Sequence, residues 1–247
     1  MVFTGRRGDT EIVVEKMLRS DLAGVFLRLL LDTLLRYIVA VTGLLLVNLG
    51  TPDTTWPRAV RAYLAEVLGD PRVLDMNPVL RWLLLRLVIL PRRSAASAEA
   101  YRKIWTDAGS PLLVNSSALA AKVAAALGPS WHVELAMRYG RPSLAAALAS
   151  FAKAGIDRFV LFPMYPQMAS STIGSTVEET FRLVGEATIP PTLAVVPPFY
   201  DHPAFISALT AIGRPILARV RPEHVVFSFH GLPERQVRKA DGASHCF

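Results

Sequence analysis

Short apolar runs alternate with longer helical stretches from Gly43 to Phe229, and this alternation limits the fold more than any other feature of the chain. The runs are continuously apolar, which is typical of strands that are buried on both faces. Strands separated by helices predict an α/β fold, an open parallel sheet with helices on both faces. The predicted strands are Leu44–Leu49, His132–Arg138, Arg158–Pro163, Leu193–Pro197 and His224–Phe229.

The helices between these strands have start and stop signals. A proline or a side-chain oxygen stands at each predicted start, and most of the predicted helices end at a glycine. The first predicted helix begins at Pro57 and stops before Gly69, the second begins at Asn115 or Ser116 and ends at Gly128, and the third begins at Pro142 and ends at Gly155. The fourth runs from Ser175 to Val184, with Glu178 at capping-box spacing from Ser175, and the fifth spans Pro203–Val220.

The segment VVPPFYDHP, residues 195–203, is typical of a linker and divides the chain into domains. One predicted helix and one predicted strand follow it, too few to bury the core of a sheet domain. We therefore predict a first α/β domain over residues 43–198 and the incomplete start of a second, similar domain over 199–247. Residues 1–42 are predicted to be an extension outside both.

That extension fits neither a spanning helix nor a signal peptide, because charged residues interrupt its apolar run over residues 17–41. Two readings stay open: an amphipathic helix on a membrane surface, and an extension upstream of a later start such as Met17.

Composition narrows the function classes. The chain has 247 residues, is 52% apolar and carries a net charge of +7, which favours anionic partners. No nucleic acid is expected, because the arginines are scattered and no nucleic-acid motif accompanies them. The one cysteine, Cys246, excludes an internal disulfide and fits the cytoplasm. The glycine-rich motifs of dinucleotide and nucleotide triphosphate sites and the nucleophile elbow of hydrolases are absent.

Ligands of open parallel sheets bind at the carboxyl ends of the strands, so the residues there are the candidates for function. His230 follows the last predicted strand, and a neutral imidazole can accept a proton or bind a metal; it can equally be a structural histidine in a turn. The hydroxyl-rich segment 163–175 precedes a helix and suits a carboxylate or phosphate, or only caps that helix.

Two further strand ends and an arginine pair are candidates. Arg138 can clamp a carboxylate, and Tyr139 can pack against a ring system. Arg92 and Arg93 follow an apolar stretch and either pair with acidic groups at a pocket mouth or are solvated. Gly50 after the first strand gives a turn that would let a ligand approach the backbone.

Together these segments resemble the ferrochelatase family. The matching pieces occur in the family's order and with similar spacing. They are LLLVNLGTPD (44–53), LPRRSAASAEAYRKIW (90–105), GSPL (109–112), AMRYGRPS (136–143), FPMYPQMASSTIGS (162–175) and VVFSFHGLPER (225–235).

The resemblance implies two similar α/β halves with a porphyrin in the cleft between them. The implied reaction inserts Fe²⁺, a substrate, into protoporphyrin IX or coproporphyrin III with release of two protons, in haem biosynthesis. It implies that His230 is the catalytic base, a metal contact, or both. The implied substrate-binding residues are Arg92, Arg93, Ser110, Arg138, Tyr139, Tyr165 and Ser171.

The chain departs from the family pattern in its last part. The family's catalytic glutamate lies further along than Phe247, so the resemblance implies a C-terminally truncated fragment, expected to be inactive by itself. A [2Fe–2S] cluster is expected only in a longer chain, with Cys246 as one of four ligands. The alternatives are a cobalt or nickel chelatase of another tetrapyrrole and a non-catalytic porphyrin- or haem-binding protein. The expected location is the cytoplasm, with peripheral membrane contact as an open reading.

Overall fold

A computed structural model describes residue 28 and residues 41–242 of the chain. The chain divides into two compact units, residues 1–41 and residues 42–247, and the fold below is that of the second unit. The predicted N-terminal extension, apart from residues 28, 41 and 42, and the candidate cluster ligand Cys246 therefore lie outside the described residues.

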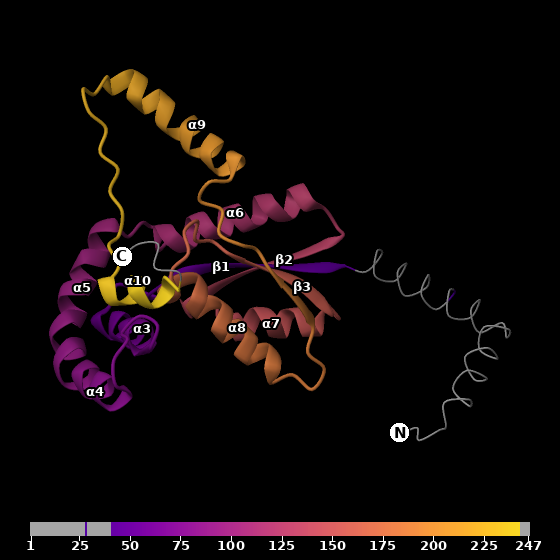
Figure 1. The fold of residues 1–247 in the computed structure, drawn as a ribbon, viewed down its shortest axis with the longest axis horizontal. Helices are drawn as coiled ribbons and strands as arrows, with labels where there is room; N and C mark the ends of the chain where they lie inside the picture. Colours follow the sequence, from indigo (N-terminus) through magenta and orange to yellow (C-terminus); the bar gives the residue numbers. More distant parts are fainter. Residues whose placement is uncertain (1–27, 29–40, 243–247) are drawn as a thin grey trace. The chain divides into compact units, whose positions relative to one another are not determined.

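The second unit is built on a parallel sheet of four strands in the order β2-β1-β3-β4. β1 lies in the middle and pairs with β2 on one side and with β3 on the other (Figure 1). This arrangement confirms the predicted open parallel sheet and the first four predicted strands, with small changes at the ends. The strands are β1 (Thr42–Thr51), β2 (Trp131–Gly140), β3 (Arg158–Pro163) and β4 (Thr192–Val195).

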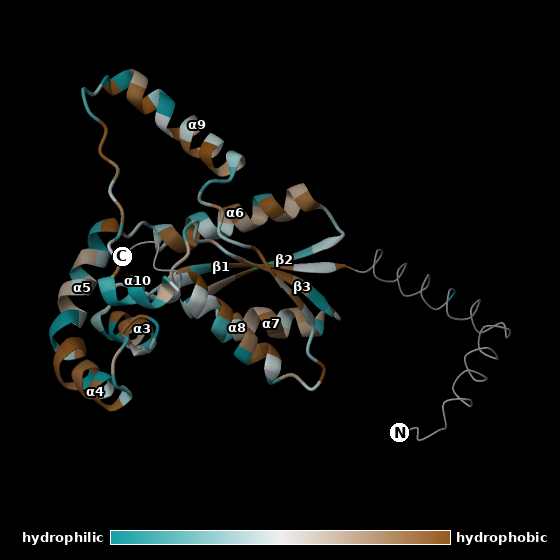
Figure 2. Ribbon diagram, in the orientation of Figure 1, coloured by the Kyte–Doolittle hydropathy of each residue, from teal (hydrophilic) through white to brown (hydrophobic). Residues whose placement is uncertain are grey.

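Helices cover both faces of the sheet. α6 (Pro111–Leu127) packs on one face against β1 and β2, while α7 (Leu144–Lys153) and α8 (Ser175–Gly185) lie on the other (Figure 1). The strands between these layers carry brown, apolar stretches (Figure 2). The core forms where both layers meet the sheet, and its fully buried members include Leu45, Val47, Ala136 and Leu161.

Two predicted helix starts were wrong. α6 begins at Pro111 rather than at Asn115 or Ser116, because Pro111 is well suited to the first turn and Ser116 instead accepts a hydrogen bond from the Asn48 amide at 3.1 Å. α7 begins after Ser143, whose hydroxyl accepts from the Ala146 amide, while Pro142 follows a cis peptide bond outside the helix.

A helical arm follows β1. α3 (Pro57–Gly69) matches its prediction, and α4 (Pro78–Leu83), the π-helical turn η1 (Leu84–Ile89) and α5 (Leu90–Ile104) then run on without a break. The π-turn ends two residues before Pro91, which cannot donate the hydrogen bond that an uninterrupted α-helix needs at this position. A second π-turn, η2 (Ser170–Gly174), leads into α8.

The region after β4 departs most from the prediction. α9 (Pro203–Val220) has the predicted bounds but buries none of its residues, and α10 (Glu234–Ala240) follows at the end of the described chain. The predicted strand His224–Phe229 was wrong: the segment is irregular and each of its residues is exposed. A strand needs a neighbour to receive its backbone hydrogen bonds, and no strand of the described residues lies beside this one.

Within residues 41–242 and at residue 28, no helix is long and apolar enough to cross a membrane.

Candidate functional site

The carboxyl ends of β1 and β2 form the floor of two neighbouring cavities. One of about 810 Å³ is lined by Tyr63, Arg138 and Tyr139, and one of about 400 Å³ by Trp105 and Ser110. Residues 51–53, 141 and 142 line both. Cavities of this size suit small organic ligands, and they lie where the topology predicts a ligand.

Gly50 serves the packing of the two strand ends. Its φ is +113°, and a side chain there would place a Cβ atom 1.8 Å from the Tyr139 carbonyl oxygen. The predicted turn at this residue was wrong, because Gly50 lies within β1 and pairs with Tyr139, and the close backbone approach is that of β2 rather than that of a ligand.

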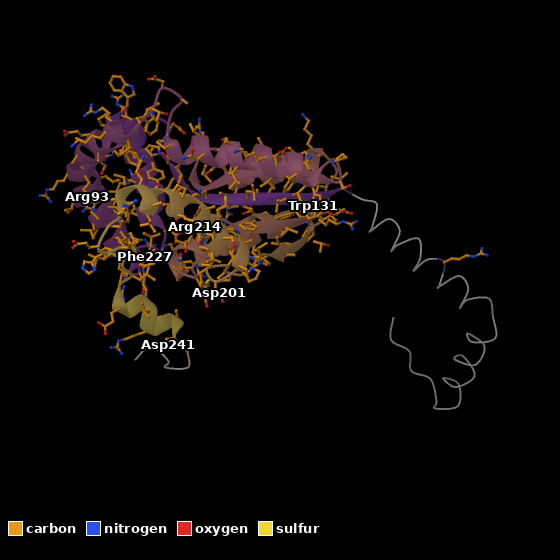
Figure 3. All side chains as sticks on the ribbon, turned by 90° about the horizontal axis from the view of Figure 1, so that it is seen from above. Arg93, Trp131, Asp201, Arg214, Phe227 and Asp241 are labelled. Carbon is orange, nitrogen blue, oxygen red and sulfur yellow. The ribbon has the colours of Figure 1, made fainter. Side chains whose placement is uncertain are left out.

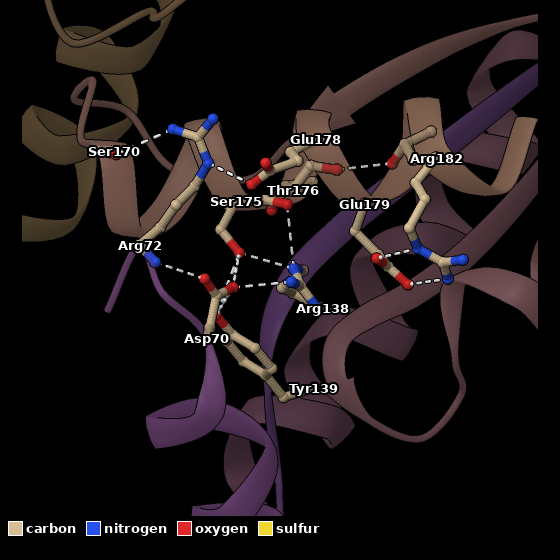
Figure 4. A network of polar contacts seen from close by, with 11 residues as sticks. Asp70, Arg72, Arg138, Tyr139, Ser170, Ser175, Thr176, Glu178, Glu179 and Arg182 are labelled. Carbon is tan, nitrogen blue, oxygen red and sulfur yellow. Dashed lines mark hydrogen bonds and ion pairs between the residues drawn. The ribbon is translucent and has the colours of Figure 1, made fainter. Parts of the chain in front are cut away.

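A buried carboxylate, Asp70, organises the side chains at this edge of the sheet (Figure 4). Its Oδ2 accepts hydrogen bonds from the Arg138 guanidinium at 2.8 Å, the Tyr139 hydroxyl at 2.8 Å and the Ser175 hydroxyl at 2.6 Å. Its Oδ1 accepts from the Arg72 backbone amide at 2.7 Å. The side chains of Asp70 and Arg138 are 3% and 16% exposed, so this ion pair is shielded from water.

The same network changes the pKa values of its members. Burial by itself would raise the pKa of Asp70, but hydrogen bonds from Ser175, Arg72 and Tyr139 and the charge of Arg138 outweigh it and lower that pKa. Burial raises the pKa of Tyr139 far above its usual value, so its hydroxyl stays protonated and donates to Asp70. Arg138 and Tyr139 are thus predicted site residues that the structure brings together, held by a residue that was not predicted.

A second group of ion pairs holds the start of α8. Arg72 pairs with Glu178 and donates to the Ser170 hydroxyl at 3.0 Å (Figure 4). Glu179 pairs with Arg182, and the hydrogen bond from Arg182 lowers the pKa of Glu179. Ser175 and Glu178 were predicted as a capping box, yet the Ser175 hydroxyl donates to Asp70 and the Glu178 carboxylate pairs with Arg72.

Ser110 and Tyr165 lie at neighbouring parts of the same edge. Ser110 is buried at the start of α6, where its side chain makes no capping hydrogen bond. The Tyr165 hydroxyl is buried without a hydrogen-bond partner among the described residues, and burial raises its pKa to about 12. The Thr176 hydroxyl, also buried and without a partner within hydrogen-bond distance, lies close enough to lower this pKa in part, so the two hydroxyls are neighbours.

The remaining predicted residues lie apart from the Asp70 network. Arg92 and Arg93 are exposed on α5, and Ser171 is half-buried in η2. His230 is exposed in the irregular connection between α9 and α10. Among the described residues, no group of three or more His, Cys, Asp or Glu side chains is placed to hold a metal ion.

The chain is similar in sequence to known proteins of one family. A family model described as ferrochelatase matches residues 41–245. The ferrochelatase of Ectopseudomonas mendocina is 46% identical over 206 residues, which are 83% of this chain and 59% of that protein. The ferrochelatase of Legionella pneumophila strain Corby is 41% identical over 83% of this chain and 60% of its own length. That of Pseudomonas putida is 44% identical over 80% of this chain and 57% of its own.

The chain belongs to the ferrochelatase family. It spans about three fifths of the length of the ferrochelatases just named. The matched residues include every described element from β1 to α10, so the Asp70 network lies within the ferrochelatase region.

Proposed function

We propose that these 247 residues form the porphyrin-binding part of a ferrochelatase, which inserts Fe²⁺ into protoporphyrin IX or coproporphyrin III during haem biosynthesis. Membership of the family, over residues 41–245, is the observation that carries the proposal. The cavities at the carboxyl ends of β1 and β2 support it, because they combine apolar walls with hydroxyl and guanidinium groups.

Metal insertion needs two contributions from the protein. The flat macrocycle must be bent and lose two N–H protons, and binding energy from its periphery can offset the strain. Ser110 at the start of α6 and the exposed Arg92 and Arg93 are suited to bind propionates. His230 is proposed as the proton acceptor and as a contact for the incoming iron.

Arg138 and Tyr139 are proposed to shape the wall of the site. Asp70 already satisfies the charge of Arg138, so a propionate would have to compete with an internal carboxylate at 2.8 Å. We therefore assign Arg138 to the rigid support of the porphyrin face, where the Tyr139 ring packs beside it at 4.5 Å from centroid to guanidinium carbon.

Residues 199–247 are proposed to begin a second α/β domain, with residues 43–198 as the first. α9 and the segment 224–229 support this, because they expose apolar side chains that a sheet domain would bury. A cavity of about 720 Å³ lies between the apolar face of α9 and the side chains of Val225 and Phe227. With His230 beside this unburied region, we propose that the 247 residues bind porphyrin without completing iron insertion.

Peripheral membrane contact is proposed for the arm formed by α4 and η1, with the cytoplasm as the protein's location. Its apolar side chains are exposed, Arg86 is an exposed cation, and residues 76–98 contain no Asp or Glu. This combination suits an anionic lipid surface. The exposed apolar residues are Val79, Leu80, Trp82, Leu83, Leu87 and Val88.

A cluster of the [2Fe–2S] type is not assigned to these residues. Such a cluster takes four ligands, and Cys246 is the one cysteine in the sequence.

An anaerobic absorbance titration tests the proposal. Porphyrin is added to the purified 247-residue chain, with and without Fe²⁺, and the Soret band is followed. We expect a saturable shift of the band that weakens several-fold in Ser110→Ala and not in Ser130→Ala, which alters an exposed residue in the turn before β2. Absence of a saturable shift would contradict the proposal; metal insertion at the rate of a longer relative would contradict the proposed inactivity. Faster insertion of Co²⁺ or Ni²⁺ than of Fe²⁺ would favour the alternative chelatase.

A further inference from the structure

α10 lies against the loop that joins α3 to α4, and charged contacts hold it there. The Lys239 ammonium donates to Asp75 Oδ2 at 2.6 Å, and the Arg235 guanidinium reaches the same oxygen at 3.4 Å and donates to the Asp75 carbonyl. The Gln236 amide donates to the carbonyls of Arg72 at 3.3 Å and Val73 at 3.4 Å. Three side chains of one short helix thus converge on one loop.

Packing alone does not account for this placement. α10 has seven residues and none of them is buried, and an isolated helix of this length is unstable in water. A crevice of about 690 Å³ opens between the helix and the loop, lined by Leu232, Val237 and Met168 among others. The polar contacts to Asp75 and to the loop carbonyls are therefore what keeps α10 in position.

The loop connects this contact to the buried network. Asp70 lies at the start of this loop, and its carboxylate binds Arg138, Tyr139 and Ser175. The backbone carbonyl of Asp70 accepts hydrogen bonds from the amides of Val73 and Leu74, which form a turn. Asp75, five residues later, binds α10. His230 precedes α10 by four residues, so the position of this helix limits where the histidine can lie.

We propose that Asp75 is a positioning residue, which anchors the segment carrying His230 to the loop that carries Asp70. The hydrogen bond from Lys239 also lowers the pKa of Asp75, so the carboxylate keeps its charge to a lower pH than an ordinary aspartate does. The role assigned to His230 rests on the proposed function, whereas the anchoring itself does not.

Hydrogen–deuterium exchange of the full 247-residue chain tests the anchoring, and it needs neither porphyrin nor iron. In Asp75→Asn, amides of residues 236–241 should exchange about 1.5- to five-fold faster, the range expected for exposed ion pairs. Asp75→Glu keeps the carboxylate and should restore exchange close to that of the unchanged chain. Asp107→Asn, an exposed aspartate in another turn, is the matched control and should leave these amides unaltered.

A double-mutant cycle gives the pairwise contribution. Lys239→Gln should speed the same amides by a similar factor, and Asp75→Asn combined with Lys239→Gln should add little to either change. Fully multiplicative effects, or unaltered exchange in both single variants, would overturn the proposal. If Asp75→Asn fails to fold, as judged by exchange in β1, the exchange of α10 in Lys239→Gln tests the anchoring by itself. This variant should fold, because the Lys239 side chain is largely exposed on α10.

An NMR signal reports on the positioning of the histidine. The His230 imidazole resonance, assigned by its loss in His230→Gln, should shift or narrow in Asp75→Asn and keep its position in Asp75→Glu and Asp107→Asn. A His230 signal that is the same in all of these variants would overturn the positioning role, even where exchange in α10 changes. Because free chain without porphyrin is observed, neither result depends on whether the protein inserts iron.

Discussion

Two apolar segments of this molecule differ in structure: one forms a buried strand and the other is irregular and exposed. Leu44–Leu49 forms the middle of β1, which pairs with β2 and β3, and its Leu45 and Val47 side chains are fully buried in the core. His224–Phe229 has no strand beside it among the described residues, and Val225, Val226, Phe227 and Phe229 are 52% to 88% exposed. Apolar, β-branched sequence therefore favours a strand only where neighbouring strands complete the hydrogen bonds and other layers cover the faces.

The largest difference in stability between the two regions is expected when an apolar side chain is truncated in each. Leu45→Ala should destabilise the chain by about 3 kcal/mol, because it leaves a cavity in the core. Phe227→Ala, on the exposed connection between α9 and α10 (Figure 3), should change stability by no more than about 0.5 kcal/mol. Urea unfolding followed by circular dichroism measures both; similar losses in the two variants would remove the distinction between the regions.

The buried network should show the next largest effect. Asp70→Asn removes the charge that pairs with Arg138 in a shielded site, so we expect a loss of about 2–3 kcal/mol. Glu186→Gln, which removes a carboxylate paired with Arg182 on the exposed face of α8, should alter stability by at most about 0.5 kcal/mol. Urea unfolding of both variants measures the two losses of stability. Equal losses would show that burial of the Asp70–Arg138 ion pair is unimportant.

The pH dependence of stability sharpens this result. The folded state lowers the pKa of Asp70, so its contribution is present above the unfolded pKa of about 4 and is lost as pH falls through the lower folded pKa. Unfolding free energies measured between about pH 6 and pH 2 should decline more steeply for the unchanged chain than for Asp70→Asn. Asp75 and Glu179 also have lowered pKa values, and both proteins retain their contributions. Parallel curves would contradict the assignment to Asp70.

The smallest change in stability is expected on α9. Ile212→Ser replaces a side chain that is largely exposed, so folding should be nearly unaffected. The exposed apolar face of α9 should nevertheless promote self-association, and this variant should reduce it in sedimentation velocity at increasing protein concentration. Ala211→Ser, on the same helix, is the control; a loss of stability above about 1 kcal/mol in Ile212→Ser would indicate that α9 is packed in solution.

Local patterns predicted the sheet well because they report local causes. Continuous apolar runs predicted β1, β2 and β3 almost to their ends, and Pro57 and Gly69 bound α3 as expected. The errors arose where two local signals competed, as for Pro111 against Ser116 in α6, or where a segment lacked its neighbours, as for residues 224–229.

The organisation of the candidate site could be predicted only in part. Arg138, Tyr139 and Ser110 were recognised because they follow strands or match family segments, and they do lie at the carboxyl edge of the sheet. Asp70 was missed because its side-chain partners are 68 to 105 residues away along the chain, a separation that no local pattern reports. A carboxylate directly after a helix end beside a parallel sheet is the weak signal that could have drawn attention to it.

The most direct measurement joins this chain to the remaining part of the Ectopseudomonas mendocina ferrochelatase, beyond the 59% that it already matches, and assays anaerobic Fe²⁺ insertion into porphyrin. We predict insertion by the joined protein, loss of at least about 100-fold in its His230→Ala variant, the low end for a general base, and no insertion by the 247-residue chain alone. A joined protein that binds porphyrin but inserts no iron, or inserts it equally well without the imidazole, would contradict the proposed function.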